Sequence, residues 1–168
     1  DIQMGSVQEV YRWVQEGRVD MCFASRQESV TLDWTPLRDD ELFAILPPDY
    51  DNGGRSAFPV EEFTGKEFLM PSMGFTLDIM RVLNRHGVLP LIRTTQVSDS
   101  VIISMVEHGL GVSMLSRLVL QGRQDDVQAL PLAPRAVREL GIASRPRKEL
   151  RLAVRRFIAE AREMIEKM

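Results

Sequence analysis

Segments with the spacing of amphipathic helices alternate with short apolar runs, and this alternation constrains the fold more than any other feature of the sequence. Apolar residues recur at helical spacing from Val7 to Val14. The next apolar run, Val19 to Ala24, is too short for a helix and apolar on both faces. Such a strand is typical of a parallel sheet covered by helices on each side. The sequence therefore predicts an α/β protein.

The same alternation continues along the rest of the chain. Gly17, Gly87 and Gly109 each end a helix-like segment, as a residue suited to a left-handed C-cap does. The final helix is predicted from an apolar stripe between Leu150 and Ile165. The strands are predicted at residues 19–24, 34–37, 42–46, 67–70, 91–97, 112–115, 127–132 and 138–144, and a short helix at 118–120.

Prolines mark two places where the chain is expected to cross between lobes. Pro47 and Pro48 stop a central strand because they lack amide hydrogens, and Ala133-Pro134 ends the last strand of the middle part. The remaining strand and helix then return to the first part. We expect lobe I at residues 1–47 plus 134–168 and lobe II at 48–133. Each lobe has a mostly parallel central sheet flanked by helices, and two crossover strands join them.

Composition excludes several classes of protein. The net charge of −3 argues against a nucleic-acid-binding surface, which needs a basic excess. The longest apolar stretches are far shorter than the roughly 20 residues of a membrane-spanning helix. The single cysteine, Cys22, rules out a disulfide within the chain. An apolar content of 44% is sufficient for a packed core.

The sequence offers no convincing catalytic or metal-binding set. His86 and His108 each precede a glycine at a predicted helix end, where an imidazole interacts with terminal carbonyl groups. The spacings of zinc sites do not occur. Cys22 lies in an apolar run with no adjacent base, as expected of a small core residue. We therefore expect no enzyme activity, no catalytic residue, no metal and no cofactor.

The turn from Ser72 to Thr76 is a candidate anion site. It joins a predicted strand to a helix and consists of Ser72, Met73, Gly74, Phe75 and Thr76. Free amides and the positive end of the dipole at a helix start favour a carboxylate or phosphate. The hydroxyl groups of Ser72 and Thr76 would add donors. Taken alone, however, the turn is explained as well by Thr76 capping its own helix.

Two further segments favour a ligand site at this turn. Ser98, Asp99 and Ser100 form a second strand-to-helix turn, and such turns gather at the carboxyl edge of a parallel sheet, where ligands bind. In the first lobe, the matching edge places Ser25 and Arg26 where the arginine could reach a ligand carboxylate. A solvated loop charge explains Arg26 equally well.

The segment from Gly109 to Ser116 is glycine-rich but lacks the lysine and later glycine of a phosphate-binding loop. It is better interpreted as a tight turn that leads into a buried strand. The end of this strand, at Leu115 and Ser116, is expected to open on the ligand.

Three motifs, in this order, resemble the effector-binding domain of LysR-type transcription regulators. Glu16 to Asp20 follows a helix and precedes an apolar strand, and Trp34 to Pro47 contains a Pro-Leu step, charged residues, a strand and a proline. Val106 to Leu115, with its Gly-Leu-Gly step before a strand, is the most specific of the three. The resemblance extends over the whole chain and implies the type 2 periplasmic-binding-protein fold.

The resemblance implies a small ligand bound in a cleft between the two lobes. Position by position, the lining would come from Ser25 and Arg26, Ser72 to Thr76, Ser98 to Ser100, and Leu115 with Ser116. The family normally has proline where Ser116 stands, so this wall differs. The family's domain also begins with a strand and a Ser- or Thr-bearing turn before its first helix. Neither occurs here, so we expect the first strand of lobe I to be missing.

Partners and location also follow from the resemblance. It implies a small-molecule effector, homo-oligomers (dimers or tetramers) and a cytoplasmic protein with no membrane contact. DNA would be bound only through an N-terminal winged helix-turn-helix domain that this sequence does not contain. Helix-end amides and Arg26 favour a small organic acid as the effector, while sugars and amino acids stay open.

Two other functions remain open on the same fold. One is an extracytoplasmic solute-binding protein, which an upstream signal peptide would favour and an upstream helix-turn-helix would exclude. The other is an enzyme, which turnover of a bound carboxylate would support. The fold alone does not decide between these functions.

Overall fold

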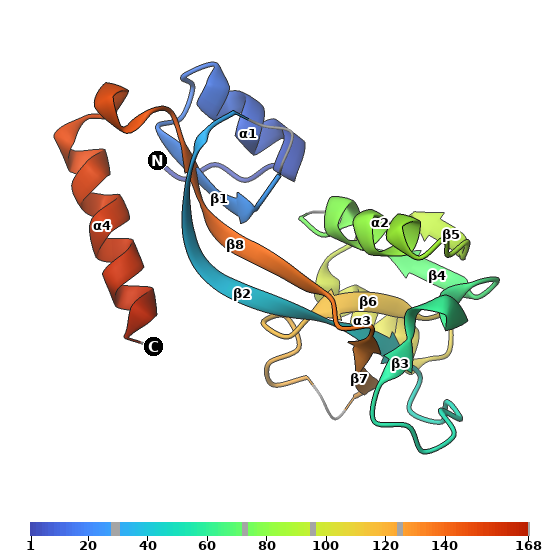
Figure 1. Ribbon diagram of the computed structural model, residues 1–168. Helices are drawn as coiled ribbons and strands as arrows, with labels where there is room; N and C mark the ends of the chain where they lie inside the picture. Colours follow the sequence, from blue (N-terminus) through green and yellow to red (C-terminus); the bar gives the residue numbers. More distant parts are fainter. Residues whose placement is uncertain (28–30, 72–73, 95–96, 124–125, 168) are drawn as a thin grey trace. The chain divides into compact units, whose positions relative to one another are not determined.

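The computed structural model describes residues 1–27, 31–71, 74–94, 97–123 and 126–167 (Figure 1). Helices and strands alternate as predicted, and the α/β class is confirmed. The elements are α1 (Val7–Gln15), β1 (Met21–Ser25), β2 (Asp33–Leu46), β3 (Phe58–Pro59), η1 (Val60–Phe63), β4 (Glu67–Met70), α2 (Thr76–Arg85), β5 (Leu91–Thr94), α3 (Asp99–Glu107), β6 (Ser113–Ser116), β7 (Gln128–Ala133), β8 (Val137–Ser144), η2 (Arg147–Glu149) and α4 (Leu152–Glu166).

The chain divides into two compact units. Unit 1 consists of Asp1–Asp39 and Arg138–Met168, and unit 2 of Asp40–Val137. The chain passes between the units within β2 and at the start of β8. The crossings expected from the prolines, at 47/48 and 133/134, both fall inside unit 2.

Strand directions differ from the mostly parallel sheets that the sequence predicted. β1 pairs with β8, and β2 with β6 and β7, in antiparallel ladders. β3 with β7 and β4 with β5 form parallel ladders. The physical reason is the connection: β4, α2 and β5 form a strand-helix-strand crossover, which parallel pairing requires. β8 runs opposite to β1, and β6 and β7 run opposite to β2.

The predicted strands at 34–37 and 42–46 are one continuous strand, β2. The residues between them, 38–41, are all charged. Asp40 is nevertheless buried, and its carboxylate accepts the amide of Leu118 at 3.2 Å. The predicted short helix at 118–120 is instead a turn, in which the carbonyl of Ser116 accepts the amides of Val119 and Leu120.

α1 forms where its sequence pattern places it. Ser6 caps the helix, and Glu9 completes a reciprocal capping box, in which the Glu9 carboxylate accepts the Ser6 amide at 2.9 Å. Val7, Tyr11 and Val14 are buried on one face. Gly17, with φ of +71°, follows the C-terminal end and takes the left-handed conformation that a glycine adopts without strain.

Unit 2 has a layer of strands with a core on each side. The first core contains Ala44, Phe68 and, from α2, Ile79, while the second contains Ile45, Leu69 and, from α3, Ile102. Consecutive residues of β2 and β4 therefore enter opposite cores, as alternation along a strand requires. α2 and α3 thus cover opposite faces and are held rigidly by packing.

β1 in unit 1 is less covered than its apolar sequence predicted. Phe23 is 57% exposed and contacts the ring of Phe157 on α4 edge to face, with centroids 6.2 Å apart. The apolar stripe of α4 is present, yet none of its described residues is buried. Among the described residues, no helix combines the length and apolar character needed to cross a membrane.

Candidate functional site

In unit 2, the two predicted strand-to-helix turns start from one edge of a parallel ladder. Met70, the last residue of β4, pairs with Thr94, the last residue of β5. α2 begins at Thr76 and α3 at Asp99, each a few residues beyond its strand. The parallel pairing therefore brings both helix N-termini to the carboxyl edge of the same two strands. This is the arrangement in which helix amides can share one anionic ligand.

At the start of α2, the described part of the predicted turn is Gly74 to Thr76. Phe75 is the N-cap residue and is buried at 4% exposure, which makes it a packing residue of the first core. Thr76 does not cap its helix through its side chain: its hydroxyl donates to the carbonyl of Pro71 at 3.1 Å. This bond ties the end of β4 to the first turn of α2. Ser72 and Met73 lie outside the described residues.

At the start of α3, Ser98 occupies the N-cap position. Its hydroxyl contacts the hydroxyl of Ser100 at 2.9 Å and makes no cap hydrogen bond to the described helix amides. Both serine side chains are exposed. Two hydroxyl groups and the helix N-terminus thus face solvent together, where they can donate to an anion. Asp99, in the first turn, is half-buried.

The structure buries Leu115 and Ser116, which the sequence placed at the ligand. Both are 0% exposed, and Leu115 belongs to the second core with Ile45 and Leu69. β6 also begins beside β4, because Phe68 and Val112 form a parallel bridge and the Ser113 hydroxyl donates to the carbonyl of Leu69. β6 therefore packs beside β4 and supports its edge.

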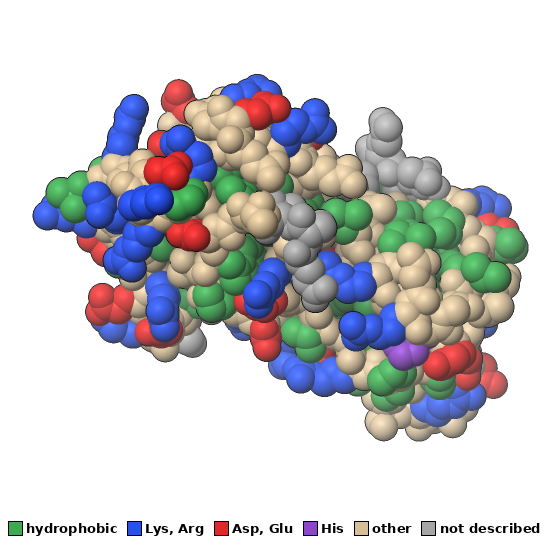
Figure 2. Space-filling view, turned by 45° about the horizontal axis from the view of Figure 1, so that its top comes forward, with side chains coloured by type: hydrophobic (Ala, Val, Ile, Leu, Met, Phe, Trp, Pro, Cys, Tyr) green, Lys and Arg blue, Asp and Glu red, His purple; other side chains and the backbone are tan. Residues whose placement is uncertain are grey.

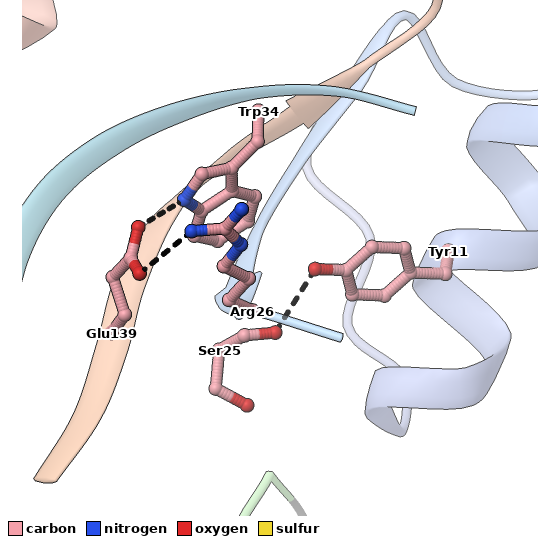
Figure 3. A network of polar contacts seen from close by, with 5 residues as sticks. All are labelled: Tyr11, Ser25, Arg26, Trp34 and Glu139. Atoms are coloured by element: carbon pink, nitrogen blue, oxygen red, sulfur yellow. Dashed lines mark hydrogen bonds and ion pairs between the residues drawn. The ribbon is translucent and has the colours of Figure 1, made fainter. Parts of the chain in front are cut away.

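In unit 1, Ser25 and Arg26 stand at the end of β1 and belong to a polar network (Figure 3). The Arg26 guanidinium donates to Glu139 Oε2 at 3.1 Å, and its amide donates to the Glu139 carbonyl at 2.9 Å. Ser25 is 3% exposed, and its carbonyl accepts the Tyr11 hydroxyl at 3.0 Å. Arg26 itself has a half-exposed side chain.

Sequence reasoning missed the residues that orient Arg26. Glu139 on β8 holds Arg26 with one carboxylate oxygen and accepts the Trp34 indole N–H, at 2.5 Å, with the other. Figure 3 shows Trp34 and Arg26 approaching Glu139 together. Glu139 is 113 residues from Arg26 in the sequence. Only the antiparallel pairing of β1 with β8, which no local pattern reveals, brings them together.

The described residues contain no candidate metal centre. No group of three His, Cys, Asp or Glu side chains among them can hold a metal ion. His86 and His108 are the C-cap residues of α2 and α3, as predicted from the glycines that follow them. His108 Nδ1 lies 2.8 Å from the Ser104 carbonyl of its own helix.

Cys22 should be unreactive in the folded chain. It is buried at 7% exposure, and burial raises the pKa of its thiol to about 11. A disulfide reagent at pH 8 should therefore label it only after unfolding. Equal labelling rates for the native and the denatured chain would contradict this assignment.

The same pKa shift predicts a pH dependence of stability. The unfolded chain loses the thiol proton near the ordinary pKa of 9.0, at a lower pH than the folded chain, so stability should fall as the pH rises above 9.

Comparison with known proteins identifies the family. Residues 1–166 match the family model of the LysR substrate binding domain. The match extends over nearly the whole chain, so the protein belongs to this family, as the motifs indicated.

The relatives and solved structures agree with this family. Two HTH-type transcriptional regulators of Bacillus subtilis (strain 168), both described as uncharacterized, are similar in sequence. YvbU is 23% identical over 95% of this chain and 55% of its own length, and YybE is 24% identical over 77% and 46%. This chain thus spans about half the length of the curated relatives it matches.

Two solved regulatory domains have the same fold. The CcmR regulatory domain of Synechocystis PCC6803, in complex with 2-PG, superposes with a TM-score of 0.85 at 21% identity, covering all of this chain and 84% of that one. The effector-binding domain of QuiR, in complex with shikimate, gives 0.81 at 16% identity, covering 97% and 79%.

Proposed function

We propose that this chain is the effector-sensing part of a transcription regulator and that it binds a small organic acid. The observation that carries the proposal is the common edge of β4 and β5, which brings together the N-termini of α2 and α3. Both helices are fixed by their own core clusters, so their amides are preorganised for an anion. The complexes of CcmR with 2-PG and of QuiR with shikimate support a search for small ligands.

The ligand residues that we propose are of two kinds. Donors to the anionic group come from the turns Ser72 to Thr76 and Ser98 to Ser100, and a guanidinium from Arg26, with Ser25 beside it. Leu115 and Ser116 are buried, so we propose that they support the site by packing and do not donate to the ligand. A charge-assisted hydrogen bond contributes about 1.5–3 kcal/mol to the binding free energy. The loss of such bonds to Arg26 and to one helix N-terminus would therefore be enough for the protein to bind an acid more tightly than its neutral amide.

Sensing requires a difference in affinity between two conformations of the protein. A ligand shifts a population only as far as it binds one conformation more tightly than the other. In the complete regulator, we propose that this shift is passed to an N-terminal helix-turn-helix domain that contacts DNA, within a cytoplasmic homodimer or homotetramer. The helix-turn-helix relatives favour this function over solute transport. We propose no turnover of the ligand.

The test is a thermal-shift screen of small carboxylic acids, each paired with its neutral amide. An acid at 100 times its dissociation constant should add about 2.7 kcal/mol to the free energy of unfolding, whereas its amide should add much less. Arg26→Gln should then weaken binding of the best acid about tenfold or more. Arg38→Gln, which removes an exposed arginine of β2, should leave the affinity within twofold. Stabilisation only by neutral or cationic compounds would refute the organic-acid proposal.

A further inference from the structure

A cavity of about 570 Å³ lies within unit 1, along α4. Its apolar lining includes Trp34 from β2, Leu150 and Ile158. Three arginines, Arg147, Arg155 and Arg162, also line it. The volume falls in the range of small-molecule sites, which combine apolar walls with a few polar groups. None of these residues belongs to the candidate effector residues.

The charges around the cavity leave two cations available. Of the acidic lining residues, Glu163 pairs with Lys167 at 2.6 Å and Glu166 pairs with Arg162 at 2.8 Å. The third, Asp33, accepts the backbone amide of Arg147 at 2.8 Å. Within the described part of the chain, the guanidinium groups of Arg147 and Arg155 form no ion pair. A backbone amide does not neutralise the Asp33 carboxylate, so the lining residues together with Lys167 carry four positive and three negative charges, a net charge of +1.

Positive charges also outnumber negative ones in the sequence around the cavity. Residues 145–156 contain six basic side chains and one acidic side chain, although the whole chain has a net charge of −3. Figure 2 shows Lys and Arg side chains over the part of the chain around α4, with acidic side chains among them. A local positive field in an otherwise acidic protein raises the local concentration of anions.

We propose that this cavity is a second ligand site and that it binds an aromatic carboxylate. The carboxylate would pair with Arg155 and Arg147, and the ring would lie against Trp34, Leu150 and Ile158. A guanidinium and a carboxylate form the stronger class of hydrogen bond, and an aromatic ring buries apolar surface against the indole. Arg147 and Arg155 are exposed, so a purely apolar ligand would gain nothing from their guanidinium groups, and a cation would be repelled by them.

Trp34 provides the reporter for this site. One side of its indole lines the cavity, and its N–H donates to Glu139. The chain has two tryptophans, and the other, Trp13, lies on α1 beside Gly5 and Arg18. The NMR spectrum of the ¹⁵N-labelled chain should therefore contain one indole signal that responds to the cavity and one that does not.

The experiment is a titration of the 168-residue chain with benzoate, followed by these indole signals. Benzoate should shift the Trp34 signal saturably and leave the Trp13 signal in place, and benzamide should cause no saturable shift. Replacing both cavity arginines, Arg147→Gln with Arg155→Gln, should weaken benzoate binding at least tenfold. Arg151→Gln is the matched control, because Arg151 is exposed in the same segment but does not line the cavity. It should change the affinity less than twofold.

Three results would overturn the proposal. These are no saturable shift of the Trp34 signal, equal binding of benzamide, or unchanged benzoate affinity in the double variant with native thermal stability. Ser98→Ala separates this site from the proposed effector site, since Ser98 belongs to unit 2 and its replacement should leave the Trp34 titration intact. Failure of the benzoate titration would leave the organic-acid screen as an independent test of the proposed function.

Discussion

Phe63→Ala is expected to lower the free energy of unfolding by about 3–5 kcal/mol, because truncation of a fully buried phenylalanine loses transfer energy and leaves a cavity. Phe63 is 0% exposed and lies between two other rings of the first core. Its centroid is 4.8 Å from that of Phe58 and 5.3 Å from that of Phe68. Urea unfolding followed by far-UV circular dichroism measures the change.

Phe157→Ala serves as the matched control. Phe157 is 47% exposed on α4 and contacts Phe23 at its edge. Its truncation should cost less than about 1.5 kcal/mol, because little surface is buried and no closed cavity forms. Similar losses for the two variants would show that Phe63 does not lie in the packed core described here.

Gly111→Ala should destabilise the chain by about 2–4 kcal/mol, because an added methyl group overpacks a closed site and the backbone there is strained for any other residue. A Cβ at residue 111 would lie 2.7 Å from the carbonyl oxygen of Glu67 and 3.2 Å from the side chain of Leu69. The obstacle is backbone, so a side-chain rotation cannot relieve it. Moving Glu67 would also disturb the bond from the Val112 amide to the Glu67 carbonyl, at 2.8 Å.

Gly109→Ala separates the steric effect from backbone strain. Gly109 has φ of +71°, and nothing lies within 4 Å of the Cβ that it would gain. Its replacement should cost only about 1–2 kcal/mol, the strain of a left-handed residue. Thermal unfolding of both variants would test the difference. If Gly109→Ala lowered the free energy of unfolding as much as Gly111→Ala, close packing around residue 111 would not explain the effect.

Helix positions could be predicted because their signals are local. The apolar spacing of Val7, Tyr11 and Val14 fixes the buried face of α1, and Gly17 ends the helix. The same logic placed His86 and His108 at helix ends, where the structure has them as C-cap residues. Caps and periodicity depend on residues within one or two turns, so a single sequence contains them.

Strand directions could not be predicted in the same way. The sequence of β1 favoured a covered parallel strand, yet β1 pairs antiparallel with β8, and Phe23 is exposed. β1 and β8 lie more than a hundred residues apart in the sequence, and apolar residues alone do not specify which neighbour a strand has. The two strands predicted at 34–37 and 42–46 were likewise not recognised as one, because the partner that buries Asp40 comes much later in the chain.

Only the part of the candidate site that has local sequence signals could be predicted. Strand-to-helix turns are visible in sequence, and the parallel pairing of β4 with β5 gathers two of them. Glu139 and Trp34, which hold Arg26, have no local signal. The cavity along α4 was also invisible, because it combines the start of β2 with a helix from the other end of the chain.

The most direct test of the central claim is amide NMR mapping of the best carboxylic acid from the screen. The account predicts that the largest saturable shifts fall on the backbone amides that open α2 and α3, at Phe75, Thr76, Asp99 and Ser100, and on the guanidinium signal of Arg26. Largest shifts on other surfaces, with these amides unchanged at saturation, would contradict it.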